Sequence, residues 1–194
     1  MVRARSLNEI KKISHSCQIV ADTLIMLEPY VVPGAKVSDL DKLAEKFIIS
    51  KGARPAFKGY MGFPSTLCVS IEDAVVHGIP TEQILEEGQI VGIDCGAEVD
   101  GYFGDHAKSF PVGKIDNYKK ELLKITYESL LAGIEQAKPG NFVGDIGCAV
   151  QTHAENHGFS VAGTNFLCKT IPRYKRRSAV IISTPRDIWI TKKK

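Results

Sequence analysis

Two aspartates, Asp94 and Asp105, have the spacing in this sequence that best suits metal binding. Each lies in a run rich in β-forming residues, and the pair Asp100-Gly101 separates the two runs. An Asp-Gly pair flanked by such runs is typical of a tight β-hairpin. A two-residue turn at this pair predicts that Asp94 lies opposite Ala107 and that Asp105 lies opposite Gly96.

That register predicts that the two carboxylates share one face of the hairpin as diagonal neighbours, with Cβ atoms about 7 Å apart. The residues expected beside them, Gly92, Gly96 and Ala107, are small and leave room for an ion. The alternative is a pair of solvated hairpin carboxylates, since aspartate is mostly exposed. However, Asp94 interrupts an apolar run, and binding a metal offsets the cost of burying a carboxylate.

Several motifs resemble the type I methionine aminopeptidases, which are metallopeptidases of the pita-bread fold. The matching segments are His77–Pro80, Ile93-Asp94, Asp100–Asp105, Glu28–Val31, Pro33-Gly34, Gly59-Tyr60 and Gly62–Pro64. The resemblance runs from about Ser6 to about Val161. His-Gly-Ile-Pro with two spaced aspartates is specific, because other pita-bread enzymes usually lack the first motif. The resemblance implies an α/β (α+β) fold that comprises the N-terminal half and part of the second half, with an antiparallel sheet covered by helices.

The resemblance also implies roles for individual residues. Asp94 and Asp105 would hold up to two divalent metal ions, which in this family are cobalt, manganese, iron or zinc. His77 would contact the substrate and help to polarise the scissile peptide bond. Tyr60, Phe63 and Cys68 would line the pocket for the methionine side chain. From the residues alone, the alternatives are that His77 is a histidine at a strand end, which the sequence without the resemblance favours, and that the other three are core residues.

The implied reaction is metal-assisted hydrolysis that removes the initiator methionine from nascent proteins. The expected partners are therefore N-terminal peptides and, through the family role, the ribosome. We expect no nucleic acid as a partner, because no RNA-binding motif is present. We also expect no membrane partner. We expect the chain to be a monomer.

The C-terminal residues depart from the family pattern. The family's site also takes a histidine and two glutamates from later in the chain. Here Lys169 or Thr170 stands near the histidine position, where an ammonium group cannot bind a metal, and no glutamate follows Glu155. Catalytic competence of this chain is therefore doubtful. The alternatives are a non-catalytic truncated homologue or a peptide- or RNA-binding module.

The charge distribution changes at the point where the resemblance ends. Residues 163–194 contain nine lysines and arginines and one aspartate, whereas the first 162 residues have a net charge of −5. We therefore predict an incomplete methionine aminopeptidase-like domain over residues 1–162. Residues 163–194 are predicted to be a basic tail that is disordered or non-native, from a truncated or frameshifted reading frame.

The composition is that of an ordinary globular protein, with 44% apolar and 24% charged residues in 194. No apolar run is long enough to span a bilayer, and no signal peptide is visible. The five cysteines are widely spaced and odd in number. We predict reduced thiols and a cytoplasmic location.

Local patterns predict the elements that position these residues. A capping box formed by Ser6 and Glu9 predicts a helix from about Leu7 to before Pro29, with Ile10, Val20 and Leu24 among its buried residues. Three further helices are predicted. The first begins at Ser38 and ends at Gly52, the second spans 117–137 with Asn117 as its N-cap, and the third spans 143–156. The predicted strands before the hairpin are 66–71 and 75–77.

The last of these helices carries two histidines, His153 and His157, four residues apart on one face. A metalloprotease helix would read His-Glu-x-x-His, whereas here Glu155 falls on another face. No third ligand is evident from the sequence. We therefore predict that both histidines are exposed polar residues on a terminal turn.

Overall fold

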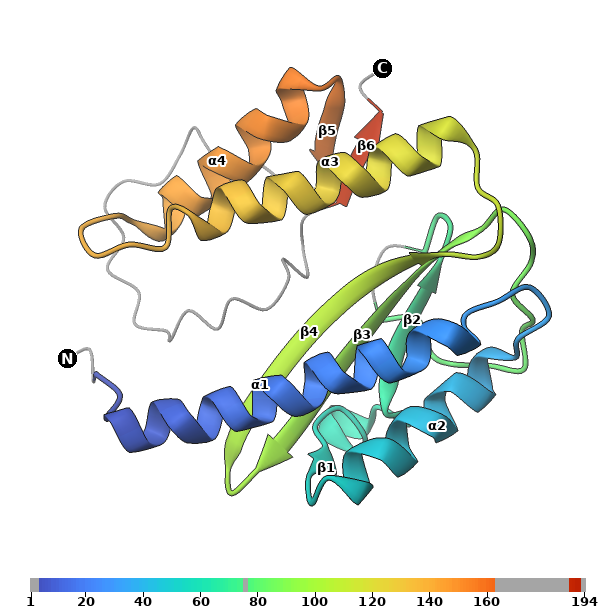
Figure 1. The fold of residues 1–194 in the computed structure, drawn as a ribbon, viewed down its shortest axis with the longest axis vertical. Helices are drawn as coiled ribbons and strands as arrows, with labels where there is room; N and C mark the ends of the chain where they lie inside the picture. Colours follow the sequence, from blue (N-terminus) through green and yellow to red (C-terminus); the bar gives the residue numbers. More distant parts are fainter. Residues whose placement is uncertain (1–3, 75–76, 163–188, 193–194) are drawn as a thin grey trace. The chain divides into compact units, whose positions relative to one another are not determined.

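The computed structural model describes residues 4–74, 77–162 and 189–192 and divides the chain into two compact units, Met1–Ile115 and Asp116–Lys194. The elements of unit 1 are α1 (Leu7–Leu27), η1 (Glu28–Tyr30), α2 (Val37–Ser50), β1 (Arg54–Pro55), η2 (Tyr60–Gly62), β2 (Leu67–Ile71), β3 (Ile90–Val99) and β4 (Tyr102–Pro111) (Figure 1). The elements of unit 2 are α3 (Asn117–Ile134), α4 (Val143–Asn156), β5 (Phe159–Ala162) and β6 (Trp189–Lys192).

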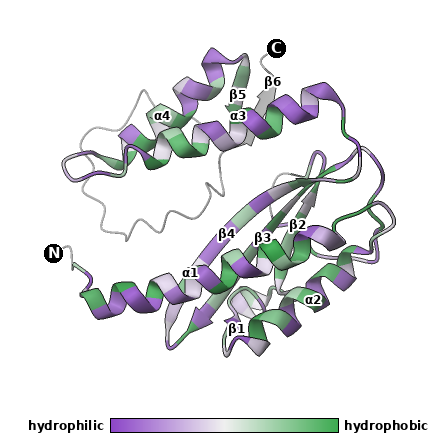
Figure 2. Cartoon of the chain, in the orientation of Figure 1, coloured by the Kyte–Doolittle hydropathy of each residue, from purple (hydrophilic) through white to green (hydrophobic). Residues whose placement is uncertain are grey.

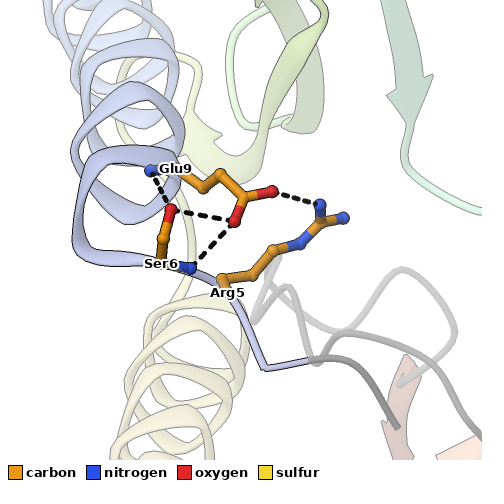
Figure 3. A network of polar contacts seen from close by, with 3 residues as sticks. All are labelled: Arg5, Ser6 and Glu9. Carbon is orange, nitrogen blue, oxygen red and sulfur yellow. Dashed lines mark hydrogen bonds and ion pairs between the residues drawn. The ribbon is translucent and has the colours of Figure 1, made fainter. Parts of the chain in front are cut away.

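The predicted capping box begins α1 (Figure 3). The Ser6 hydroxyl accepts a hydrogen bond from the Glu9 backbone N–H at 3.3 Å, and the Glu9 carboxylate accepts one from the Ser6 backbone N–H at 2.8 Å. Arg5 adds a 3.1 Å ion pair to the same carboxylate. The sequence signal for this helix start is therefore confirmed at the level of individual atoms.

Strand β3 is the centre of an antiparallel sheet in unit 1. It pairs with β4 along one edge and with both β1 and β2 along the other. Helices α1 and α2 cover one face of this sheet (Figure 1), and their apolar residues alternate with polar ones around each helix (Figure 2). The core lies between helices and sheet and includes Leu24, Leu40, Ile48, Leu67, Val91, Ile93, Cys95 and Ala97. Periodicity of 3.6 in the helices and of two in the strands creates this core.

Helix α1 lies so close to β4 that only glycine fits at one position. A Cβ on Gly104 would come within 2.4 Å of the Ser16 backbone, and the Ser16 hydroxyl donates a 2.8 Å hydrogen bond to the Tyr102 carbonyl. Val20 and Leu24 are buried as predicted, but Ile10 is 49% exposed. The hairpin turn already lies beside Lys12, which contacts Tyr102, so the first turns of α1 extend past the sheet.

Asp41 of α2 fixes the start of β2. Its carboxylate accepts hydrogen bonds from the backbone N–H groups of Thr66 and Leu67 at 3.0 and 2.8 Å. Burial raises the pKa of Asp41, and these two hydrogen bonds partly oppose that shift. A helix side chain thereby sets the register in which β2 approaches β3.

Unit 2 contains the α3–α4 pair and the β5–β6 pair. Helix α4 has the predicted bounds, whereas α3 ends at Ile134 and takes Asp116 as its N-cap, one residue before the predicted cap. The small core of unit 2 comprises Ile125, Ala154 and Phe159. Strand β6 pairs with β5 and lies within the predicted tail. Because residues 163–188 lie outside the described residues, the proposed nature of that tail stays a prediction.

The cysteines differ in part from the prediction. Cys17, Cys68 and Cys95 are free thiols, as predicted. Cys148 is disulfide-bonded, so the prediction of a reduced thiol is wrong at that position. Cys168 lies outside the described residues. Among the described helices, none has the length and apolar content that crossing a membrane requires.

Candidate metal centre

The β3–β4 hairpin has the register that the Asp100-Gly101 pair predicts. Asp94 lies opposite Ala107, and Gly96 lies opposite Asp105. The two turn residues have φ angles of 52° and 80°, the left-handed conformation that a two-residue hairpin turn requires. Asp94 and Asp105 therefore share one face of the hairpin, and both are half-buried.

This face is opposite the one that α1 covers, and its neighbouring residues are small. Gly92 and Gly96 flank Asp94 along β3, and Cys68 of β2 lies directly across from it. A Cβ on Gly96 would come within 2.5 Å of the Phe57 ring, so Phe57 lies over the sheet beside the two aspartates. The sheet therefore presents two carboxylates in a patch with a thiol and an aromatic ring nearby.

The two carboxylates affect groups on the opposite face as well. Burial raises the pKa of the Cys95 thiol, and the negative charges of Asp94 and Asp105 raise it further. Burial lowers the pKa of His106, which lies opposite Cys95, while Asp94 opposes this shift. Cys95 therefore stays a neutral thiol within the core and is not a metal ligand.

The donor set fits a divalent metal in part. Two carboxylates from adjacent strands supply oxygen ligands, and the small residues between them leave space for an ion. They account for two of the five ligands that the family resemblance implies. The geometry thus supports Asp94 and Asp105 as one side of a metal site.

The segment that contains His77 lies beside β2. Gly78 accepts a hydrogen bond at 2.8 Å from the Val69 backbone N–H, which places the His77-Gly78 segment beside β2. His77 is exposed and has a φ of 58°, so the prediction that it continues a strand is wrong. Val75 and Val76, the other residues of that predicted strand, lie outside the described residues, and His77–Pro80 belong to no helix, strand or turn.

The three predicted pocket residues differ in burial. Cys68 is buried and Phe63 is half-buried, whereas Tyr60 is 69% exposed in the short helix η2. Met61, next to Tyr60, has a φ of 47°, an uncommon backbone conformation for a residue with a side chain. Of these three, Cys68 is paired across the strands with Asp94, one of the two candidate metal ligands, and the pocket role of all three stays a prediction.

Unit 2 contains a second group of ligand-type residues that the sequence did not reveal. Glu128 of α3 lies beside His153 and His157 of α4, and one ligand atom from each lies within 4.8 Å of the others. His157 is exposed as predicted, but the His153 side chain is only 27% exposed. The spacing of the two histidines is visible in the sequence, whereas the packing of α3 against α4 alone brings Glu128 beside them.

Comparison with known proteins identifies the family. The model of metallopeptidase family M24 matches residues 11–175 of this chain. The chain belongs to this family. The match continues beyond Val161, where the motif-based resemblance ended, into residues that lie outside the described part of the structure.

The chain is similar to curated methionine aminopeptidases. It is 43% identical over 161 residues to methionine aminopeptidase 1 of Bacillus subtilis, a match that covers 83% of this chain and 65% of that protein. It is 43% identical over 160 residues to the methionine aminopeptidase of Borreliella burgdorferi, covering 82% and 64%. The chain thus spans about two thirds of the length of these relatives.

Solved structures confirm the pita-bread fold. The crystal structure of methionine aminopeptidase from Rickettsia prowazekii matches with a TM-score of 0.82 and 34% identity, covering 88% of this chain and 72% of that one. The Thermotoga maritima enzyme matches with a TM-score of 0.81 and 36% identity, covering 83% and 65%. Prolidase from Pyrococcus furiosus, at 22% identity and a TM-score of 0.71, with 79% and 44% covered, is similar in fold alone.

Proposed function

We propose that this M24 chain derives from a methionine aminopeptidase, which removes the N-terminal methionine of nascent proteins in a metal-dependent reaction. The observation that carries the proposal is the β3–β4 register, in which Asp94 and Asp105 share one face. The curated relatives with 40–43% identity, all named methionine aminopeptidases, support it. Family membership also favours an enzyme over the alternative of a peptide- or RNA-binding module.

In this proposal Asp94 and Asp105 hold the metal. The candidate ions are cobalt, manganese, iron and zinc. When bound, such an ion would lower the pKa of water, which peptide hydrolysis at neutral pH requires. His77 contacts the substrate and steadies the scissile peptide bond. Its position beside β2 supports this role, because β2 also carries Cys68 next to Asp94.

The remaining residues set the specificity. Tyr60, Phe63 and Cys68 form the walls of the methionine pocket, where apolar and aromatic side chains favour an unbranched thioether side chain. The proposed substrates are the N-termini of nascent proteins at the ribosome. The enzyme is proposed to be cytoplasmic and monomeric.

The 194-residue chain itself should have little activity. It contains no glutamate after Glu155, so the acid–base glutamate that the family resemblance implies has no counterpart. General acid–base catalysis contributes about 10²–10⁴ in rate. Methionine release from a methionine-first peptide, with added cobalt or manganese, should therefore be far slower than with the full-length Bacillus subtilis relative.

Two measurements test separate parts of this proposal, the low activity of the chain and its substrate class. Turnover within about tenfold of the full-length relative, a barrier difference of about 1.4 kcal/mol, would show that other residues complete the site. The substrate class is tested separately by nuclear magnetic resonance, in which a methionine-first peptide should shift the resonances of Cys68 and His77. A lysine-first peptide of equal length is the control, and equal shifts with both peptides would refute the methionine pocket.

A further inference from the structure

The Glu128, His153 and His157 group in unit 2 has the composition of a transition-metal site. His153 Nε2 lies 3.4 Å from Glu128 Oε2, and the two imidazole ring centroids are 4.5 Å apart. Histidines at i and i+4 lie on the same face of a helix, where both can bind one ion. The set of two histidines and one glutamate is used by proteins to bind zinc, with a fourth position left for water.

Helix packing holds these three residues in place. Ile125, one turn before Glu128, and Ala154, next to His153, are both buried in the small core of unit 2. The facing surfaces of α3 and α4 also approach closely at Gly133, where a Cβ would come within 2.8 Å of the Val150 side chain. The carboxylate and the imidazoles therefore face each other on two helices whose contact is fixed by buried residues.

A hydrogen bond orients the third ligand. His157 Nδ1 lies 2.8 Å from the His153 carbonyl oxygen. Because a carbonyl oxygen only accepts, Nδ1 carries the proton and Nε2 keeps the lone pair that a metal needs. Metal-binding histidines commonly donate their other ring N–H to a carbonyl or carboxylate. The exposed position of His157 gives an ion direct access from solvent.

Position and spacing also favour a cation. Both histidines lie at the C-terminal end of α4, the negative end of the helix dipole. Zinc bonds of about 2.0–2.2 Å place ligand atoms at most about 4.4 Å from one another, so small side-chain rotations bring the 4.8 Å group into range. A simple ion pair between Glu128 and His153 accounts for only two of the three residues.

We propose that Glu128, His153 and His157 bind a zinc-class dication that links α3 to α4. Imidazole nitrogens favour zinc, copper, nickel and cobalt over manganese and magnesium. The site lies in unit 2 and uses neither Asp94 nor Asp105, so it stands independently of the proposed peptidase function. Its zinc binding can therefore be measured with Asp94 and Asp105 replaced.

The test is zinc titration of the untagged 194-residue chain by isothermal calorimetry at neutral pH. His157→Gln and Glu128→Gln should each weaken zinc binding by at least about tenfold, since a third of the ligand set is lost. His15→Gln, which removes an exposed histidine of α1, should leave it unchanged. The double variant Asp94→Asn/Asp105→Asn should also retain the zinc site.

A second readout excludes a folding defect as the cause. In the Asp94→Asn/Asp105→Asn background, zinc should raise the urea midpoint of the parent chain and of His15→Gln, but not that of His157→Gln, whose midpoint without zinc should match the parent. Equal zinc affinity in the wild type and His157→Gln would overturn the proposal. So would zinc binding that depends on cysteine thiols instead, because it would persist in both ligand variants.

Discussion

The two groups of ligand-type residues differ in how the fold assembles them. In unit 1, Asp94 and Asp105 are brought together by the register of one hairpin, and their separation depends on backbone pairing over a few residues. In unit 2, Glu128 meets His153 and His157 only because two helices pack against each other. The first arrangement depends on local sequence, and the second depends on tertiary structure.

The donor atoms differ as well. The hairpin offers only carboxylate oxygens, which among the four candidate metals favour manganese, whereas the helix pair offers two imidazoles and one carboxylate, which suit zinc, nickel and copper. One chain should therefore distinguish two classes of metal at two separate places. Variants that alter one region while leaving the other intact can test this contrast.

The largest expected effect concerns the packing that supports the hairpin. Gly104→Ala places a Cβ within 2.4 Å of the Ser16 backbone and should force α1 away from β4. We expect a loss of about 1–3 kcal/mol in the free energy of unfolding, which is typical of overpacking. Urea denaturation followed by circular dichroism measures it.

The matched control lies on the other face of the same hairpin. Gly92→Ala would bring its Cβ no closer than 3.7 Å to the Ser70 carbonyl oxygen, which is an ordinary contact. Its unfolding free energy should stay within about 0.5 kcal/mol of the wild type. Equal destabilisation by the two variants would mean that α1 does not cover one face of the hairpin as described.

A smaller effect is expected on metal choice. Two carboxylates alone form a half-built site, so Asp94→Asn should weaken manganese binding by only about threefold, or about 0.7 kcal/mol. His157→Gln should leave manganese binding unchanged. Manganese titration by electron paramagnetic resonance measures both variants, and the reverse pattern would show that manganese prefers the helix pair.

The contrast between the regions also explains how much the sequence could predict. The Asp-Gly turn predicts every pairing of β3 with β4, because a two-residue turn allows one register. The alternation of side chains along each strand then decides which face a residue lies on. The capping box located the first residue of α1 for the same local reason. These features depend on neighbouring residues, and the structure confirms them.

Features that depend on distant contacts could not be predicted. Glu128 lies 25 residues before His153, and nothing local indicates that it faces the two histidines. The one available signal was its position, three residues after the buried Ile125 on the same helix. His77 was assigned to a strand from two preceding valines, whereas its backbone has a φ of 58°, in the left-handed region.

The smallest expected effect concerns the charge beside Glu128. Lys124 Nζ lies 3.9 Å from Glu128 Oε1, the oxygen that does not face His153, and the Lys124 side chain is largely exposed. This ammonium disfavours a second cation nearby, but exposed ion pairs are worth only about 0.2–1 kcal/mol. Lys124→Gln should therefore tighten zinc binding by no more than about threefold, and added salt should reduce the difference from the wild type. Lys119→Gln, on the same helix, serves as a comparison for the general loss of one positive charge. If Lys124→Gln weakened zinc binding, Glu128 would depend on Lys124 for its position, and the carboxylate would be part of an ion pair and not a metal ligand.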